Sequence, residues 1–243
     1  MNGYRQSPFA NITPVVKNLL IINLIFFLAM ILFDRQATIG PVTKNLGAYY
    51  FNSPDFRPWQ LITYMFMHAD FWHILFNMFA LFSIGPIVEY YIGSKRFFNF
   101  YFICGIGAVI LQMAVQAIEV HNLTGAFTIP APTLDESYLR AAGNRAQDLY
   151  NVYHTPLVGA SGAVVGLLIA FRMLYPEMEL MVMPIPIPIK AKYLVPAYIA
   201  LELFSGIKQF SGDNVAHFAH IGGALIGFIV IKAWGLKGPG SYY

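Results

Sequence analysis

The chain of 243 residues consists of long apolar runs separated by shorter polar stretches. Several runs approach the roughly 20 residues that a helix needs to cross the hydrocarbon layer of a membrane. We therefore predict an all-α, polytopic membrane domain over residues 14–234, between a short N-terminal segment, 1–13, and a short tail, 235–243. The six predicted spans are Pro14–Phe33, Asp70–Tyr91, Phe97–Ile118, Leu157–Tyr175, Ala191–Ile207 and Val215–Trp234.

Two connections, Asp34–Ala69 and Glu119–Pro156, are too long for simple turns. Within the second, Thr133-Leu-Asp-Glu136 resembles a capping box, and apolar residues at helical spacing follow it. This pattern predicts a short helix at the membrane interface. Residues 183–190 contain three alternating prolines and are expected to be extended, because proline disrupts a helix.

An even number of spans places both termini on the same side of the membrane. If that side is the cytoplasm, nine of the 15 Lys and Arg residues lie inside, in agreement with the positive-inside tendency. We therefore expect an integral protein of the plasma (inner) membrane whose two termini are cytoplasmic.

The composition agrees with a protein in contact with membrane lipids. Hydrophobic residues make up 57% of the chain and charged residues 11%, whereas roughly a quarter of a soluble domain is charged. The formal net charge is +3, without a block of Lys and Arg, so nucleic acid is not an expected partner. The single cysteine, Cys104, excludes an internal disulfide and is expected to pack among apolar residues.

Polar side chains in the spans or at their edges are candidate functional groups, because a helix in hydrocarbon avoids them unless they face a protein interior or a water-filled cavity. They are His68, His73, Asn77, Glu89, Ser161, Glu202, His217 and His220. Asn77, Ser161 and His220 each precede the aromatic residue at the inner end of their span by 14 positions. That spacing puts all three roughly 21 Å above the inner interface, within reach of water from outside.

A hydroxyl, an imidazole and an amide at one depth can carry out acyl transfer. Serine is a weak nucleophile until a base takes its proton, so we predict Ser161 as nucleophile and His220 as general base. His73 and Asn77, one turn apart on the second span, are the expected side-chain donors to the oxyanion.

Glycines next to Ser161 favour its position at the start of a helix. Glycines on both sides let the chain turn sharply and begin a helix at Ser161, so that unpaired N–H groups there also face the oxyanion. We therefore include Gly159 and Ala160 among the oxyanion and substrate-binding residues.

Glycine spacing also predicts that the fourth and sixth spans approach closely. Gly162 with Gly166, and Gly223 with Gly227, form pairs of small residues four positions apart. His220 shares a helical face with Gly223, so its side chain is expected to point toward Ser161.

From about Trp59 to Gly227 the chain resembles the rhomboid family of intramembrane serine proteases. The motifs that carry the resemblance are His68-Ala-Asp-Phe-Trp-His73-Ile-Leu-Phe-Asn77, Glu89 with Gly93-Ser94, Gly159-Ala-Ser161-Gly162, and Ala219-His220-Ile-Gly-Gly223 with Gly227.

The resemblance implies a six-transmembrane-helix rhomboid-like bundle and a Ser161–His220 dyad without an acidic third member. It further implies an oxyanion pocket that uses His73 and Asn77, and substrate access near the second and fifth spans. Transmembrane proteins are the implied substrates, and no cofactor is required.

The chain departs from the family pattern at three places. Gln60 follows Trp59 where the family often has arginine, so the structural bonds of that arginine must be met otherwise or are missing. Val165 stands where some members place an aromatic ring against the catalytic histidine, which affects the orientation of His220. The connection from Glu119 to Pro156 is longer than in minimal members and could shape substrate access.

The remaining polar residues have structural interpretations. Glu89 and Glu202 are expected to link helices rather than to serve as acids in the chemistry, and His217 is expected to be a cavity-rim or structural residue. His68, at a loop edge, fits either a structural or a direct role.

Two other functions remain open. A non-catalytic membrane adaptor could use the same fold to bind membrane segments, although such relatives should lack the serine or the histidine. An intramembrane metalloprotease could use His217 and His220 around zinc, but the chain has no His-Glu-x-x-His sequence.

Overall fold

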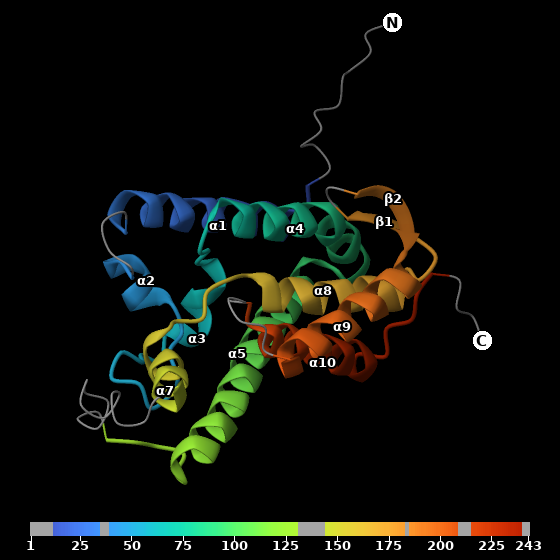
Figure 1. Cartoon of the computed structure of the whole chain (residues 1–243). Helices are drawn as coiled ribbons and strands as arrows, with labels where there is room; N and C mark the ends of the chain where they lie inside the picture. Colours follow the sequence, from blue (N-terminus) through green and yellow to red (C-terminus); the bar gives the residue numbers. More distant parts are fainter. Residues whose placement is uncertain (1–11, 35–38, 131–143, 183–184, 209–214, 240–243) are drawn as a thin grey trace, which may run out of the picture.

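The structure, a computed structural model, describes residues 12–34, 39–130, 144–182, 185–208 and 215–239. In this described part, each of the six predicted spans contains a helix, and the architecture is all-α apart from one small hairpin (Figure 1). The six helices are α1 (Pro14–Phe33), α4 (Phe71–Ile92), α5 (Ser94–Thr124), α8 (Ser161–Leu174), α9 (Ala191–Lys208) and α10 (His217–Ala233).

The helices expose apolar side chains, as a polytopic membrane protein does. Among the described residues, α1, α4 and α5 are long and apolar enough to cross a membrane. In the most apolar window of α1 only 17% of the residues are buried inside the protein, and Leu24 and Leu32 are among its exposed side chains. α8 and α10 are apolar but shorter, and α9 carries three charged residues. Hydrocarbon therefore surrounds much of the bundle.

Short elements lie at the two ends of the bundle (Figure 1). One end carries α2 (Pro41–Leu46), α3 (Gln60–Thr63), the 3-10 helix η1 (Tyr64–Phe66) and α7 (Asn144–His154). The other end carries an antiparallel hairpin of β1 (Glu179–Val182) and β2 (Ile185–Lys190), in which Glu179 pairs with Lys190.

These elements bear on two of the sequence predictions. The extended conformation predicted for the proline-rich segment is confirmed over β2. The helix predicted in the second long connection is present from Asn144 onward, whereas its capping box at 133–136 lies outside the described residues.

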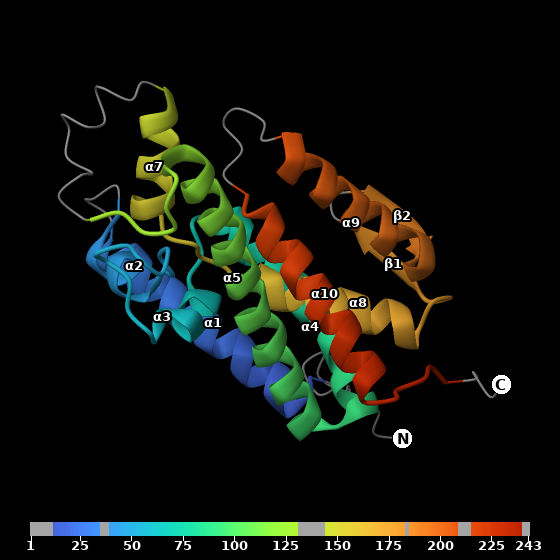
Figure 2. The same ribbon diagram turned by 90° about the horizontal axis from the view of Figure 1, so that it is seen from below.

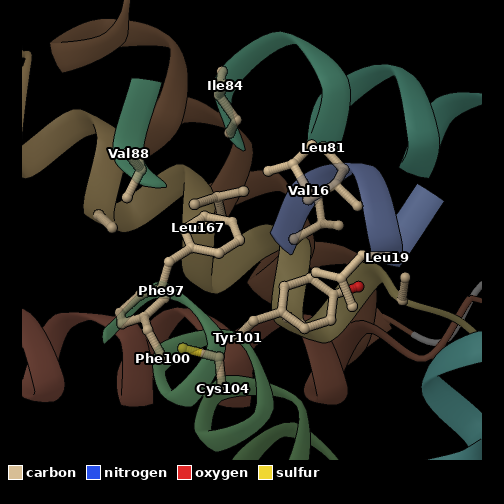
Figure 3. Packing of buried hydrophobic residues seen from close by; sticks show 14 of the residues in the cluster. Val16, Leu19, Leu81, Ile84, Val88, Phe97, Phe100, Tyr101, Cys104 and Leu167 are labelled. Atoms are coloured by element: carbon tan, nitrogen blue, oxygen red, sulfur yellow. The ribbon is translucent and has the colours of Figure 1, made fainter. Parts of the chain in front are cut away.

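The apolar core lies around α8, which packs against α4, α5, α9 and α10 (Figure 2). Figure 3 shows Val16 of α1, Leu81 of α4 and Tyr101 of α5 in the same cluster as Leu167 of α8. Cys104 is fully buried in this cluster, which confirms its predicted packing role.

α8 and α10 meet through their backbones. A Cβ atom on Gly223 would overlap the carbonyl oxygen of Gly162, and one on Gly227 would lie 2.7 Å from the carbonyl oxygen of Gly166. Only glycine permits so close an approach of the two helices, which confirms the contact predicted from the two pairs of small residues.

Glu89 links three helices at the end of the bundle that carries the hairpin. This α4 residue is 1% exposed. Its carboxylate accepts hydrogen bonds from the amides of Val15 (3.1 Å) and Val16 (2.9 Å) and from the hydroxyls of Thr13 and Ser94. It therefore caps the start of α1 and ties α1 to α4 and α5, the linking role that the sequence predicted.

Gly223→Ala is expected to lower the unfolding temperature in detergent, because the added methyl group must push α10 away from α8. Overpacking of this kind costs about 1–3 kcal/mol. Leu225→Phe is the matched control, since Leu225 is 49% exposed on the same helix and a larger side chain there only extends the outer surface. An unchanged unfolding temperature for Gly223→Ala would contradict the close contact.

Glu89→Ala is expected to lower the unfolding temperature more than Glu89→Gln, because glutamine keeps an acceptor oxygen. A hydrogen bond to a charged group contributes about 1.5–3 kcal/mol. Tyr90→Ala, at a neighbouring position that is 88% exposed, is the control for loss of a side chain. If Glu89→Ala is as stable as Tyr90→Ala, the carboxylate does not hold the three helices together.

Candidate active site

Ser161 stands at the start of α8 because the preceding segment is held extended and then turns sharply. Leu157 and Ala48 exchange two backbone hydrogen bonds of 2.7 and 2.9 Å. The amide of Gly159 donates to the carbonyl of Tyr64 at 3.0 Å, and Gly159 has φ of 134°, which favours glycine. α8 begins at Ser161, as predicted from the flanking glycines.

His220 meets Ser161 across the glycine contact between α8 and α10. Its Nε2 lies 2.8 Å from the Ser161 Oγ. The His220 side chain is almost fully buried, and in the tautomer with an unprotonated Nε2 it accepts the hydroxyl hydrogen bond. This geometry suits a serine nucleophile and its general base.

His73 lies beside Gly159, two residues before Ser161. A Cβ atom built on Gly159 would be 2.8 Å from the His73 Nε2 and 3.3 Å from the Ser161 Oγ. The glycine hydrogen thus leaves a small space beside the nucleophile, bordered by an imidazole nitrogen. The His73 amide donates to Asp70 at 2.9 Å, so the N-cap of α4 fixes the helical turn that carries this imidazole.

Asn77 lies one turn further along α4 and lines the same cavity as Ser161. Its side-chain nitrogen donates to the His73 carbonyl at 3.0 Å. An amide NH2 group has two N–H bonds, so this contact leaves a second donor that can serve a substrate oxygen. The structure thus brings together all six predicted site residues, with Ala160 buried immediately before Ser161.

A cavity of about 1470 Å³ contains this site. Ser161, His220, His73 and Asn77 line it together with side chains from α5, α7 and α9. Residues of both α4 and α9 line the cavity, as Ser161 does. The second and fifth spans, which correspond to α4 and α9, are those that the family resemblance implies for substrate access.

His68 and His217 both lie near the site. His68 is fully buried, and its ring centroid lies 5.0 Å from that of His73. Burial, and secondly the proximity of His73, lower the pKa of His68 to about 3, so its ring is neutral at physiological pH. His217 lines the cavity. Among the described residues, no group of three or more His, Cys, Asp and Glu side chains is arranged to hold a metal ion.

Glu202 contacts His220, which was not predicted from the sequence. Its Oε2 lies 2.7 Å from the Nδ1 of His217 and 2.9 Å from the Nδ1 of His220. Glu202 does link α9 to α10, as predicted, but it does so through the histidine that contacts the serine. This position differs from the dyad without an acidic member that the resemblance implies. Helical spacing places Glu202 on the same face of α9 as Tyr198, and that polar stripe was the available signal.

The structure also accounts for Gln60 at the position where arginine is common. Gln60 is fully buried. Its side-chain oxygen accepts from the Arg57 amide at 2.9 Å, and its nitrogen donates to the carbonyls of Asp55 at 3.1 Å and Lys44 at 3.4 Å. Glutamine thus supplies the bonds that organise the first long connection.

Val165 is buried one turn after Ser161 and presents no aromatic ring to His220. The neighbours of the His220 Nδ1 come from α9 instead: the Glu202 carboxylate, and the Tyr198 hydroxyl at 3.4 Å. The orientation of His220 therefore depends on α9 rather than on the aromatic ring that some members place on α8.

Comparison with known proteins gives a consistent set of relatives. A family model described as Rhomboid domain matches residues 55–235. The Rhomboid protease AarA of Providencia stuartii is 30% identical over 185 residues, which cover 72% of this chain and 56% of that protein. The Rhomboid protease GluP of Bacillus subtilis is 28% identical over 184 residues, or 76% of this chain and 27% of that protein.

A mitochondrial relative matches a similar share of the chain. Rhomboid protein 1, mitochondrial, of Saccharomyces cerevisiae is 26% identical over 171 residues, which cover 70% of this chain and 39% of that protein. The chain therefore spans about half the length of AarA and less of the other two relatives.

Gly159→Ala is expected to slow the covalent reaction of Ser161 with a fluorophosphonate, because the methyl group fills the space beside the His73 Nε2. Loss of one oxyanion donor costs roughly 10²–10³-fold in rate, and we expect a decrease of at least about tenfold. Gly125→Ala is the matched control: Gly125 also has a positive φ, of 78°, but no atom lies near its added Cβ. Equal labelling rates for the two variants would show that this space does not serve the reaction.

Proposed function

Because the chain belongs to the rhomboid family, we propose that it is an intramembrane serine endopeptidase that cleaves transmembrane segments of other membrane proteins. One observation carries the proposal: the Ser161 Oγ and the His220 Nε2 lie 2.8 Å apart inside a bundle of apolar helices. A serine hydroxyl is a weak nucleophile until a base in contact takes its proton, and the imidazole is such a base.

In the proposed reaction, the Ser161 Oγ attacks the carbonyl carbon of the scissile peptide bond while its proton moves to the His220 Nε2. The carbonyl π electrons move to the oxygen. When the C=O bond re-forms, the C–N bond breaks, and His220 gives its proton to the leaving nitrogen. A water molecule then gives a proton to His220 and attacks the carbonyl carbon of the acyl-enzyme ester. When the bond from that carbon to the Ser161 Oγ breaks, His220 returns the proton to Oγ and the new carboxyl group is released.

The charge on the substrate oxygen is stabilised by donors on two sides. His73 and Asn77 approach from α4, and the first backbone N–H groups of α8, which have no partner within the helix, approach from the Gly159–Ser161 turn. Only side-chain and backbone groups of the chain take part, so the proposed chemistry needs no cofactor.

The substrate must present an extended peptide, because the carbonyls of an intact helix are already hydrogen-bonded. We propose that a transmembrane segment passes between α4 and α9 into the cavity and unwinds there beside Ser161. A cavity of this size accommodates a stretch of extended chain together with the water that hydrolysis requires.

The protein is an integral membrane protein. We propose that it resides in a plasma (inner) membrane, with the segments 1–13 and 235–243 both in the cytoplasm. The Lys and Arg residues near the end of the bundle that carries the hairpin, such as Lys190 and Lys192, support this orientation.

Ser161→Ala and His220→Ala are each expected to abolish cleavage of a reporter transmembrane substrate by the purified protein in detergent or lipid vesicles. Both should also abolish fluorophosphonate labelling while the unfolding temperature stays close to that of the wild type. Asn77→Ala is expected to lower kcat more than it changes KM. Full cleavage by Ser161→Ala would overturn the proposal.

The same experiment separates the alternative functions. A non-catalytic adaptor would bind the reporter substrate without cleavage and without labelling of the wild type. A metalloprotease would cleave without labelling and would lose activity in the presence of a chelator. Either result would refute a serine endopeptidase.

A further inference from the structure

A buried carboxylate touches the proposed general base on the side away from the serine. Glu202 projects from α9, is 7% exposed and lies with its Oε2 2.9 Å from the Nδ1 of His220. Tyr198, one turn earlier on α9, has its hydroxyl 3.4 Å from the same nitrogen. The imidazole thus has the serine hydroxyl at one nitrogen and a carboxylate at the other.

This arrangement selects one tautomer of His220. A carboxylate can only accept hydrogen bonds, so a neutral imidazole beside it carries its proton on Nδ1 and donates to Glu202. The Nε2 is then unprotonated and can accept the proton of Ser161. The bond to Glu202 also holds the ring in the plane that aims Nε2 at the Ser161 Oγ.

A carboxylate beside His220 also favours the reaction electrostatically. Proton transfer from Ser161 turns His220 into an imidazolium cation in a region of low dielectric constant, where an unpaired charge is costly. A carboxylate at 2.9 Å offsets that charge as it forms. No proton needs to pass to Glu202, because the cation and the anion neutralise each other in place.

Glu202 has further hydrogen-bond partners besides His220. Its Oε2 also lies 2.7 Å from the His217 Nδ1, and the Tyr198 hydroxyl donates to the same carboxylate. A carboxylate only accepts hydrogen bonds, so donors of this kind satisfy its oxygens inside the bundle while it stays in contact with His220. His217 is therefore a support for Glu202 rather than a second base.

We propose that Glu202 is a positioning residue of the active site: it orients His220 and stabilises its cationic form, so that the chain works with Ser161, His220 and Glu202 together. The inference rests on the proposed protease function. It also explains how the chain functions with Val165 in place of an aromatic residue, because α9 supplies the contact that α8 does not. The alignment of His220 consequently depends on the position of α9, which forms one wall of the cavity.

The test compares purified full-length variants on a reporter transmembrane substrate. Glu202→Gln keeps the size of the side chain but loses its charge, and kcat should fall at least about tenfold, as expected when the acidic partner of a catalytic histidine is removed. KM should change by less than about twofold, because Glu202 acts on the reaction step rather than on substrate binding. Leu203→Ala, a neighbouring residue of α9 that is 45% exposed, is the control and should retain the wild-type kcat.

Glu202→Asp keeps the charge on a shorter side chain, and its kcat per folded molecule should exceed that of Glu202→Gln. This order holds even if both variants are less stable, because the amount of folded protein is taken from the thermal unfolding transition, which does not depend on the reactivity of Ser161. A purely structural Glu202 would give the two variants similar kcat values, or would lower kcat and raise KM together with the loss of folded protein.

Failure of this inference is distinguishable from failure of the proposed function. A wild-type protein that neither cleaves the reporter nor reacts at Ser161 would refute the protease function. A wild-type protein that cleaves, with a Glu202→Gln variant that retains its kcat, would refute only the role of Glu202.

Discussion

The backbone contact between α8 and α10 is the constraint on which the site depends. Gly223 leaves no room for a side chain against the carbonyl of Gly162, and Gly227 leaves almost none against that of Gly166. Because the helix axes come this close, the short side chain of Ser161 reaches the imidazole of His220 at 2.8 Å. Side chains of ordinary size at the glycine positions would separate the helices by several ångströms, which a hydrogen bond does not tolerate. The glycine contact therefore sets both the packing of α8 against α10 and the distance between Ser161 and His220.

The lipid surroundings explain why three buried polar side chains, Glu89, Gln60 and Glu202, each have several partners within the protein. Water cannot enter the hydrocarbon to satisfy a carboxylate or an amide, so each such group needs partners within the protein. Glu89 finds them in the first amides of α1, Gln60 in the carbonyls of the first long connection, and Glu202 in two histidines of α10. The first two stabilise the framework of the fold. The third touches the proposed base, and this contact distinguishes it from a structural link.

Much of this arrangement was predictable because the membrane imposes strong rules. The six helices follow from runs of apolar residues, the start of α8 follows from the glycines beside Ser161, and the close helix contact follows from glycines four positions apart. Glu202 was correctly predicted to link helices, but its contact with His220 depends on the rotation of α9 about its axis, which a weakly amphipathic helix does not reveal. The pairing of β1 with β2 was likewise not predictable, since alternating prolines indicate extended chain without indicating its partner. The bonds of Gln60 involve three separate carbonyls, and their positions are set by tertiary structure alone.

The central claim is that Ser161 is a nucleophile activated across the α8–α10 contact. An experimental structure of the protein in lipid after reaction with a small fluorophosphonate tests it most directly. We predict a covalent bond from phosphorus to the Ser161 Oγ, with the phosphoryl oxygen in the space between Gly159 and His73 and with His220 still between Ser161 and Glu202. A structure in which Ser161 is unmodified, or in which α8 and α10 are too far apart for Ser161 and His220 to meet, would contradict the account.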